Sequence, residues 1–151
     1  MLTTWLDYHR DTLAWKCAGL TDEQLRERAV PPSSLSLLGL VRHMSDVERG
    51  WFRRVLGGED ARYRYSTDTK PDAEFDDVGT ADVVAAFASW RADCERAREL
   101  VAAAPSLDVT GERRDERFSL RWILVHMIEE YARHNGHADL LRERIDGTVG
   151  E

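Results

Sequence analysis

The chain has 151 residues, of which 42% are hydrophobic and 32% charged, and a formal net charge of -7 at pH 7. These values are typical of one soluble domain, which we place over residues 1–151, and the acidic balance excludes nucleic acid as a partner because it repels phosphate. No apolar run approaches the roughly 18 residues of a membrane span, and the N-terminus lacks the pattern of a signal peptide, so we expect a cytoplasmic protein without a membrane partner.

The first predicted helix covers about residues 3–18, where apolar residues recur every three or four positions. Gly19 follows it, at the position where many helices end in a left-handed residue. Thr21 and Gln24 have the spacing of a capping box. A short helical turn is therefore expected there, ended by the prolines at 31 and 32.

A second long helix is predicted to reach about residue 56, with Ser34 or Ser36 as its N-cap. Its inward stripe includes Leu40 and Val47, with His43 or Met44 between them. Residues 59–79 are polar and aperiodic. They predict a long connection that crosses the bundle and covers a site.

Thr80 is the predicted N-cap of a third helix, whose apolar pattern continues until Pro105. A polar loop then leads to Ser119, the predicted N-cap of the longest helix, over about residues 120–145, which Gly147 ends. Four long helices and one long connection predict an all-α four-helix bundle with a crossover.

The fourth predicted helix has polar residues where its inward stripe would normally contain Leu or Ile. Glu130 and His134 are four residues apart and His137 follows three later, so these side chains project from one helix face. His43 has the same inward spacing on the second helix. Burying such groups without compensation costs several kcal/mol, and a divalent cation would compensate them.

Two interpretations of this cluster remain open from the pattern alone. Two histidines and one carboxylate leave coordination positions of a metal open, as is typical of reactive sites. A hydrogen-bonded core network, in which Glu130 pairs with His134, explains the same pattern without a metal.

Several residues near this pattern receive weaker assignments. His126 lies at the edge of the stripe, and His9 is predicted to be a core histidine. The cysteines at 17 and 94 lack CxxC spacing and are predicted to pack between helices. Two acidic and three basic residues are candidates for orienting the ligands or holding an anionic substrate group, although solvent-facing roles are commoner. These residues are Glu129, Asp139, Arg42, Arg49 and Arg133.

Two segments resemble the DinB-like superfamily of metal-binding four-helix proteins: LVRHMSDVERGWF and SLRWILVHMIEEYARHNGHADLLRERIDG. KCAGLTDEQL and PPSSLSLLGLVRHM resemble its actinobacterial branch of unknown function, the mini-circle proteins. The superfamily takes one histidine from the second helix and two ligands from the last, which implies His43, Glu130 and His134 as metal ligands. Glu130 replaces a histidine of many members, as in mycothiol-dependent maleylpyruvate isomerases.

The resemblance implies a metal-dependent enzyme acting on a low-molecular-weight thiol, as a mycothiol-type S-transferase or isomerase, with mycothiol as co-substrate. Zinc is the first metal expected, with nickel, iron and manganese as alternatives. His137 is assigned a catalytic part, as a fourth ligand, a water-orienting group or a proton-transfer residue. The expected partners are a small-molecule substrate and a second copy in a homodimer. The alternative functions are a non-catalytic metal-binding or small-molecule-binding stress protein, and a purely structural helical domain.

Overall fold

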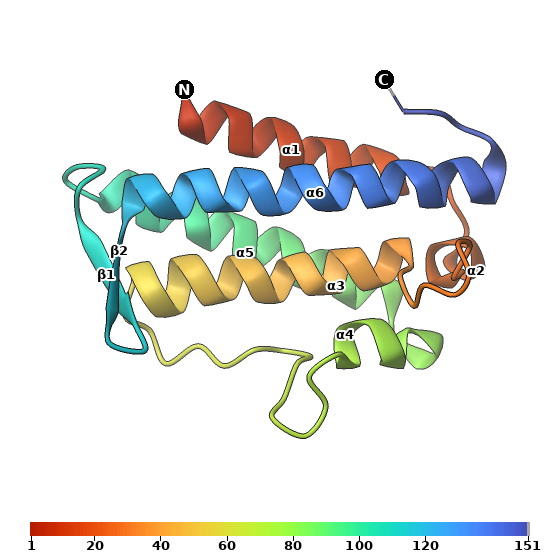
Figure 1. The fold of residues 1–151 in the computed structure, drawn as a ribbon, viewed down its shortest axis with the longest axis horizontal. Coiled ribbons are helices and arrows are strands. Elements are labelled where there is room, and N and C mark those ends of the chain that lie inside the picture. Colours follow the sequence, from red (N-terminus) through yellow and green to blue (C-terminus); the bar gives the residue numbers. More distant parts are fainter. Residues whose placement is uncertain (151) are drawn as a thin grey trace.

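A computed structural model describes residues 1–150, in which four long helices lie side by side (Figure 1). They are α1 (Leu2–Cys17), α3 (Leu37–Glu48) continued by the π-helix η1 (Arg49–Leu56), α5 (Val83–Ala103) and α6 (Leu120–Asp146). The shorter elements are α2 (Asp22–Arg26), α4 (Ala73–Asp76), the 3-10 helix η2 (Asp77–Thr80), β1 (Thr110–Arg113) and β2 (Glu116–Ser119). The predicted all-α class is confirmed. No helix within residues 1–150 is both long and apolar enough to cross a membrane.

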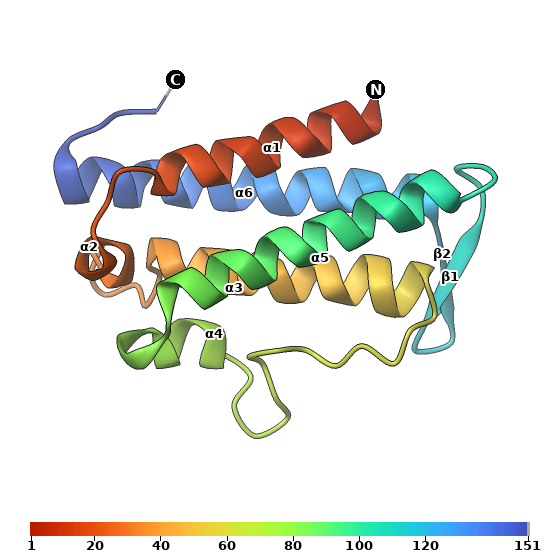
Figure 2. The ribbon, with the colours of Figure 1, turned by 180° about the vertical axis from the view of Figure 1, so that it is seen from behind.

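The direction of the four long helices explains the long connection. α1 and α6 run in one direction, whereas α3 and α5 run in the opposite direction (Figures 1 and 2). Since α3 and α5 are consecutive and parallel, the chain must return along the whole bundle between them. This crossover, residues 57–82, runs beside α3 and contains α4, as the polar and aperiodic sequence predicts.

The helix ends follow local side-chain chemistry. The predicted N-caps are formed at Thr21, Ser36 and Ser119, each of which accepts a hydrogen bond from a backbone N–H three residues later. The prediction for α5 was wrong: Asp82, not Thr80, is its N-cap, and accepts the N–H of Ala85 at 2.9 Å. Thr80 instead ends η2. Asp is at least as good an N-cap as Thr, so both residues are suitable by chemistry, and in the structure the helix begins after the later one, Asp82.

The segment before α6 is an antiparallel hairpin rather than the predicted loop. β1 and β2 pair through a tight turn in which Arg114 and Asp115 both have positive φ. The hairpin packs on the end of η1, where Gly111 lies so close to the backbone of Val55 that a Cβ atom would not fit. The strands were missed because their polar side chains show no apolar alternation.

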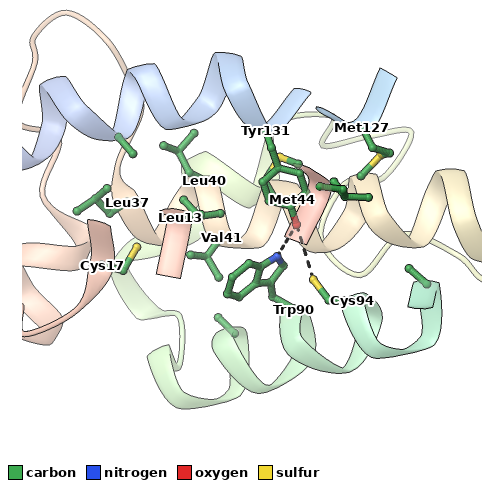
Figure 3. Close-up of a cluster of buried hydrophobic side chains, with 14 of the residues drawn as sticks. Leu13, Cys17, Leu37, Leu40, Val41, Met44, Trp90, Cys94, Met127 and Tyr131 are labelled. Carbon is green, nitrogen blue, oxygen red and sulfur yellow. Dashed lines mark hydrogen bonds between the residues drawn. The ribbon is translucent and has the colours of Figure 1, made fainter. Parts of the chain in front are cut away.

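The core is built from all four long helices (Figure 3). Leu13 from α1, Met44 from α3 and Met127 from α6 are fully buried within it. The cysteines at 17 and 94 are also buried, which confirms their predicted packing role. Burial raises the pKa of the Cys17 thiol to about 12 and that of Cys94 well above its ordinary value, so both remain protonated at neutral pH.

The same core contains a closed polar network around Glu48. Arg10 donates from Nε and Nη2 to the two carboxylate oxygens of Glu48, each at 2.8 Å. The Tyr131 hydroxyl donates to Glu48 Oε1 at 2.8 Å. Trp90 Nε1 donates to that hydroxyl at 2.9 Å (Figure 3). Every helix of the bundle supplies one member, so the network fixes the four helices relative to one another.

Candidate metal centre

Three of the predicted site residues converge between α3 and α6. One ligand atom from each of His43, Glu130 and His134 lies within 4.8 Å of the other two. The i,i+4 spacing places the latter two on one face of α6, and α3 passes that face at His43, whose ring centroid is 4.8 Å from that of His134. All three side chains are half-buried. The structure therefore brings together residues that are about ninety positions apart.

These residues lie beside the core stripe of α6, not within it. Met127, Tyr131 and Ala138 are buried and continue the stripe, whereas Glu130 and His134 are partly exposed at its edge. The predicted stripe was wrong at these two positions. Each residue of a helix turns the side-chain direction by about 100°, so a stripe that passes through Tyr131 instead of Glu130 still includes Met127 and Leu141, which are buried as predicted.

His43 is oriented by a carboxylate from the crossover. Glu74, on α4, is 5% exposed, and its Oε1 lies 3.2 Å from His43 Nδ1. Phe75 stacks on the same imidazole with ring centroids 5.3 Å apart. Within residues 1–150 no hydrogen bond reaches the other ring nitrogen, Nε2. A metal-binding histidine commonly has this arrangement, with a carboxylate on its second nitrogen.

His134 is held in the same way by a second histidine. His137 Nδ1 lies 3.3 Å from His134 Nδ1, while His134 Nε2 points to Glu130 Oε2 at 3.6 Å. His137 thus lies behind His134, outside the three converging side chains. Burial, together with the nearby His134 and Arg133, lowers the pKa of His137, so it is a neutral imidazole at neutral pH.

Glu130 lies between two imidazoles. Its Oε1 is 3.5 Å from Nε2 of His126, and its Oε2 faces His134. The close imidazole of His134 lowers the pKa of Glu130 although partial burial acts in the opposite direction, and the neighbouring His126 adds to the lowering. The carboxylate is therefore ionised at neutral pH, which is the form that binds metal.

The residues present fit a divalent metal. Two imidazoles and one carboxylate are the mixed donor set that zinc and its neighbours in the transition series accept. The contact between His134 Nε2 and Glu130 Oε2, at 3.6 Å, is longer than an ordinary hydrogen bond, so both groups can still accept a further partner. In addition, Glu74 Oε2 is buried with no hydrogen-bond partner among the described residues, and a nearby cation would compensate the charge of this carboxylate.

A cavity of about 400 Å³ opens beside these three side chains. The indole of Trp51 forms part of its wall, with His126 packed against it at a centroid distance of 4.8 Å. Arg113 of the hairpin places its guanidinium 4.9 Å from the centre of the Trp51 ring. The lining residues are His43, Asp46, Val47, Trp51, Tyr63, Ser66, Glu74, Arg113, His126 and Glu130. Substrate-sized molecules therefore have access to the cluster.

None of the three arginines proposed from the sequence lines this cavity. Arg49 pairs with Asp93, Arg133 contacts a neighbouring carboxylate on the surface of α6, and Arg42 is buried beside a different cavity. Arg113 takes the expected cationic position instead. It was missed because it lies on the unpredicted hairpin.

The acidic residues proposed to orient the ligands have other partners. Glu129 is exposed and pairs with Arg133, and Asp139 pairs with Lys16 of α1, so Glu74 has the orienting position expected of them. No sequence pattern marks Glu74, because it lies in the aperiodic connection. His9 is half-buried on α1, and burial lowers its pKa.

Comparison with known protein families matches residues 1–147 to the family described as Mycothiol-S-transferase. Neither the curated proteins nor the solved structures contain a match to the chain. The family is a member of the DinB-like superfamily, so the resemblance found in the helical segments is confirmed. The cluster of two histidines and a glutamate is compatible with the divalent metal expected of such a protein. From the match over nearly its whole length, the chain belongs to the Mycothiol-S-transferase family.

Proposed function

We propose that this protein is a metal-dependent S-transferase that joins a low-molecular-weight thiol of the mycothiol type to a small electrophile. The observation that carries the proposal is the convergence of His43, Glu130 and His134 beside an open cavity. Family membership supports the class of thiol. An open coordination position next to a substrate-sized cavity is typical of catalytic metal sites rather than structural ones.

His43, Glu130 and His134 would hold the ion, for which zinc is our first expectation and nickel, iron or manganese are alternatives. When bound, such an ion lowers the pKa of a coordinated thiol and so raises the fraction of reactive thiolate at neutral pH. Glu74 keeps Nε2 of His43 directed at the site. His137 contributes through His134, whose Nδ1 it contacts.

The cavity walls would bind the electrophile and receive the proton. Trp51 offers an apolar surface, and Arg113 offers a cation for a carboxylate or a developing negative charge. When the thiol ionises, its proton would pass to His126, an imidazole on the cavity wall outside the ligand set, and then to solvent. The thiolate sulfur would then form its bond to the electrophilic carbon. The leaving group departs with the bonding electron pair.

The first test is the metal content of the purified protein and of two ligand variants, His43→Ala and His134→Ala. We expect about one equivalent of metal in the unmodified protein and loss of it in both variants. His9→Ala is the matched control, because His9 is a half-buried histidine on α1 outside the cluster, and it should retain the metal. Absence of metal after reconstitution with each of the four ions would exclude the proposal.

The second test separates catalysis from metal storage. Cobalt(II) replaces the metal, and mycothiol is added while the sulfur-to-cobalt absorption is recorded. A new band that Glu130→Gln weakens and Glu129→Gln preserves would support thiol activation, because only Glu130 lies in the cluster. Metal binding without any response to thiol would favour the non-catalytic metal-binding alternative.

A further inference from the structure

A second cavity, of about 440 Å³, lies between α3, the crossover and the N-terminal half of α5. It shares no lining residue with the cavity beside His43 and Glu130, which we call the metal cavity. Its residues come from α3, from the crossover and from the first two turns of α5. They are Arg42, Arg64, Tyr65, Asp77, Thr80, Ala81, Asp82, Ala85, Ala86 and Ser89. The surface of the fold therefore has a second open cavity of binding size, apart from the cluster of His43, Glu130 and His134.

Arg42 lines this cavity with an uncompensated charge. Its side chain belongs to a residue only 6% exposed, and Nε and Nη1 are buried with no hydrogen-bond partner. Within residues 1–150 the guanidinium forms no ion pair; its contact is the ring of Tyr65, 4.3 Å from Cζ to the ring centroid. A buried cation without an acceptor is costly, and natural structures rarely retain one without a partner.

The carboxylates near this cavity do not neutralise Arg42. Asp82 Oδ1 accepts the N–H of Ala85 at 2.9 Å as the cap of α5, and Asp77 Oδ2 pairs with Lys70 Nζ at 3.3 Å. The neighbouring Arg64, by contrast, has its partner in Asp93. Arg42 is thus the lining cation whose charge has no protein acceptor in the described part of the chain.

The start of α5 adds a second favourable feature for an anion. Ala85, Ala86 and Ser89 belong to the first two turns of this helix of 21 residues and line the cavity. The N–H groups of Ala85 and Ala86 are bound by Asp82, so the helix end acts through the aligned peptide dipoles, which give it a partial positive charge that favours an anion. The helix end and the buried guanidinium therefore act in the same direction on a ligand placed between them.

We propose that this cavity binds a small molecule through a carboxylate or phosphate group, with the guanidinium of Arg42 as its anchor. A planar guanidinium matches two oxygens of such a group, and stacking on Tyr65 holds the plane in place. The alanines at 85 and 86 leave room for the ligand on the α5 side. The site is separate from the metal-dependent reaction and does not depend on it.

The experiment titrates the purified protein with inorganic phosphate, acetate, succinate and benzoate while Arg Nε–Hε signals are followed by NMR. Saturable binding of at least one probe at millimolar concentration, with the Arg42 signal shifting, is expected. Arg42→Met should weaken that binding by at least about tenfold, since it removes a charge-assisted hydrogen bond. Arg91→Met is the matched control, because Arg91 is exposed on α5 outside the cavity, and it should leave binding unchanged. Comparison of phosphate with the carboxylates identifies the group recognised.

Two further variants keep the test decisive. His134→Ala disables the metal cluster and should preserve anion binding; binding lost there but retained in Arg42→Met would place the anion at the metal and overturn the proposal. If Arg42→Met does not fold, Ala85→Leu fills the cavity from an exposed helical position and should abolish binding. No saturable binding of any probe would also overturn the proposal, and would leave Arg42 as a stacking residue.

Discussion

Two polar clusters occupy neighbouring positions on the same pair of helices, and they differ in how their charges are compensated. Glu48 of α3 and Tyr131 of α6 belong to the closed network, in which Arg10 neutralises the carboxylate. His43 of α3 and Glu130 of α6 belong to the metal cluster. The first is completely buried at Glu48, whereas the second opens on a cavity.

The difference shows what an internally satisfied network looks like in this protein. Around Glu48 the oxygen–nitrogen and oxygen–oxygen distances are 2.8–2.9 Å. Between His134 and Glu130 the closest approach is 3.6 Å, and the second nitrogen of each histidine is held by a group outside the cluster. The structure has a hydrogen-bonded core network at Glu48, which the sequence did not predict, whereas the network considered from the sequence involved Glu130 and His134. The geometry of the open cluster is compatible with an added divalent ion.

The largest expected effect comes from opening the closed network. Glu48→Ala would leave Arg10 buried without its partner, and we expect the free energy of unfolding to fall by about 3–5 kcal/mol in urea denaturation. Glu99→Ala is the control, because its pair with Arg96 is exposed and its removal should cost less than about 1 kcal/mol. Equal losses in both variants would show that the closed network stabilises the fold no more than an exposed ion pair does.

The open cluster should instead gain stability from metal. At a free metal concentration about 100-fold above Kd, the protein should gain about 2.7 kcal/mol over its chelator-treated form in the same denaturation experiment. His134→Ala should lose this gain, because it removes one of the three ligands. A metal-dependent gain of the same size in His134→Ala would show that the ion binds elsewhere.

A smaller effect is expected from the carboxylate that orients His43. Glu74→Gln retains the shape of the side chain but removes the charge next to Nδ1, and should weaken metal affinity by about 10–100-fold in competition with a chelator. Glu129→Gln, an exposed change on α6, should leave the affinity as it is. If the two variants bind metal equally well, the contact between Glu74 and His43 has no orienting role.

The smallest expected effect tests the edge of the closed network. Trp90→Phe retains the aromatic packing but removes the hydrogen bond to the Tyr131 hydroxyl, and should lower the free energy of unfolding by about 1 kcal/mol. Metal affinity should not change, because Trp90 does not belong to the cluster. A change in metal affinity would show that the two clusters are coupled through α6.

Structural features that depend only on residues close together in the sequence were predicted correctly in most cases. The caps at Ser36 and Ser119 follow from side-chain oxygens that reach N–H groups three residues later, and the long connection follows from the absence of any apolar period. The start of α5 was misplaced by two residues because Thr80 and Asp82 are both suitable caps, and only the folded chain shows which one is used.

Residues that reach the metal cavity from irregular segments were not predicted. Asp46 accepts the N–H groups of residues 64–66 at 2.6–3.1 Å and so fixes the path of the crossover along α3. The contact of Gly111 with η1 fixes the hairpin that carries Arg113. Both contacts join positions far apart in the chain, and no local pattern records them.

The sequence by itself determined the four helices and the facing of Glu130 and His134, because a helix repeats every 3.6 residues and side chains four apart share a face. Only the tertiary structure decided that Glu74 holds His43, that Arg113 lines the metal cavity, and that Arg42 is buried beside another. The reason is physical: helical facing is set by local backbone geometry, whereas the path of a loop is set by the distant groups that bind it.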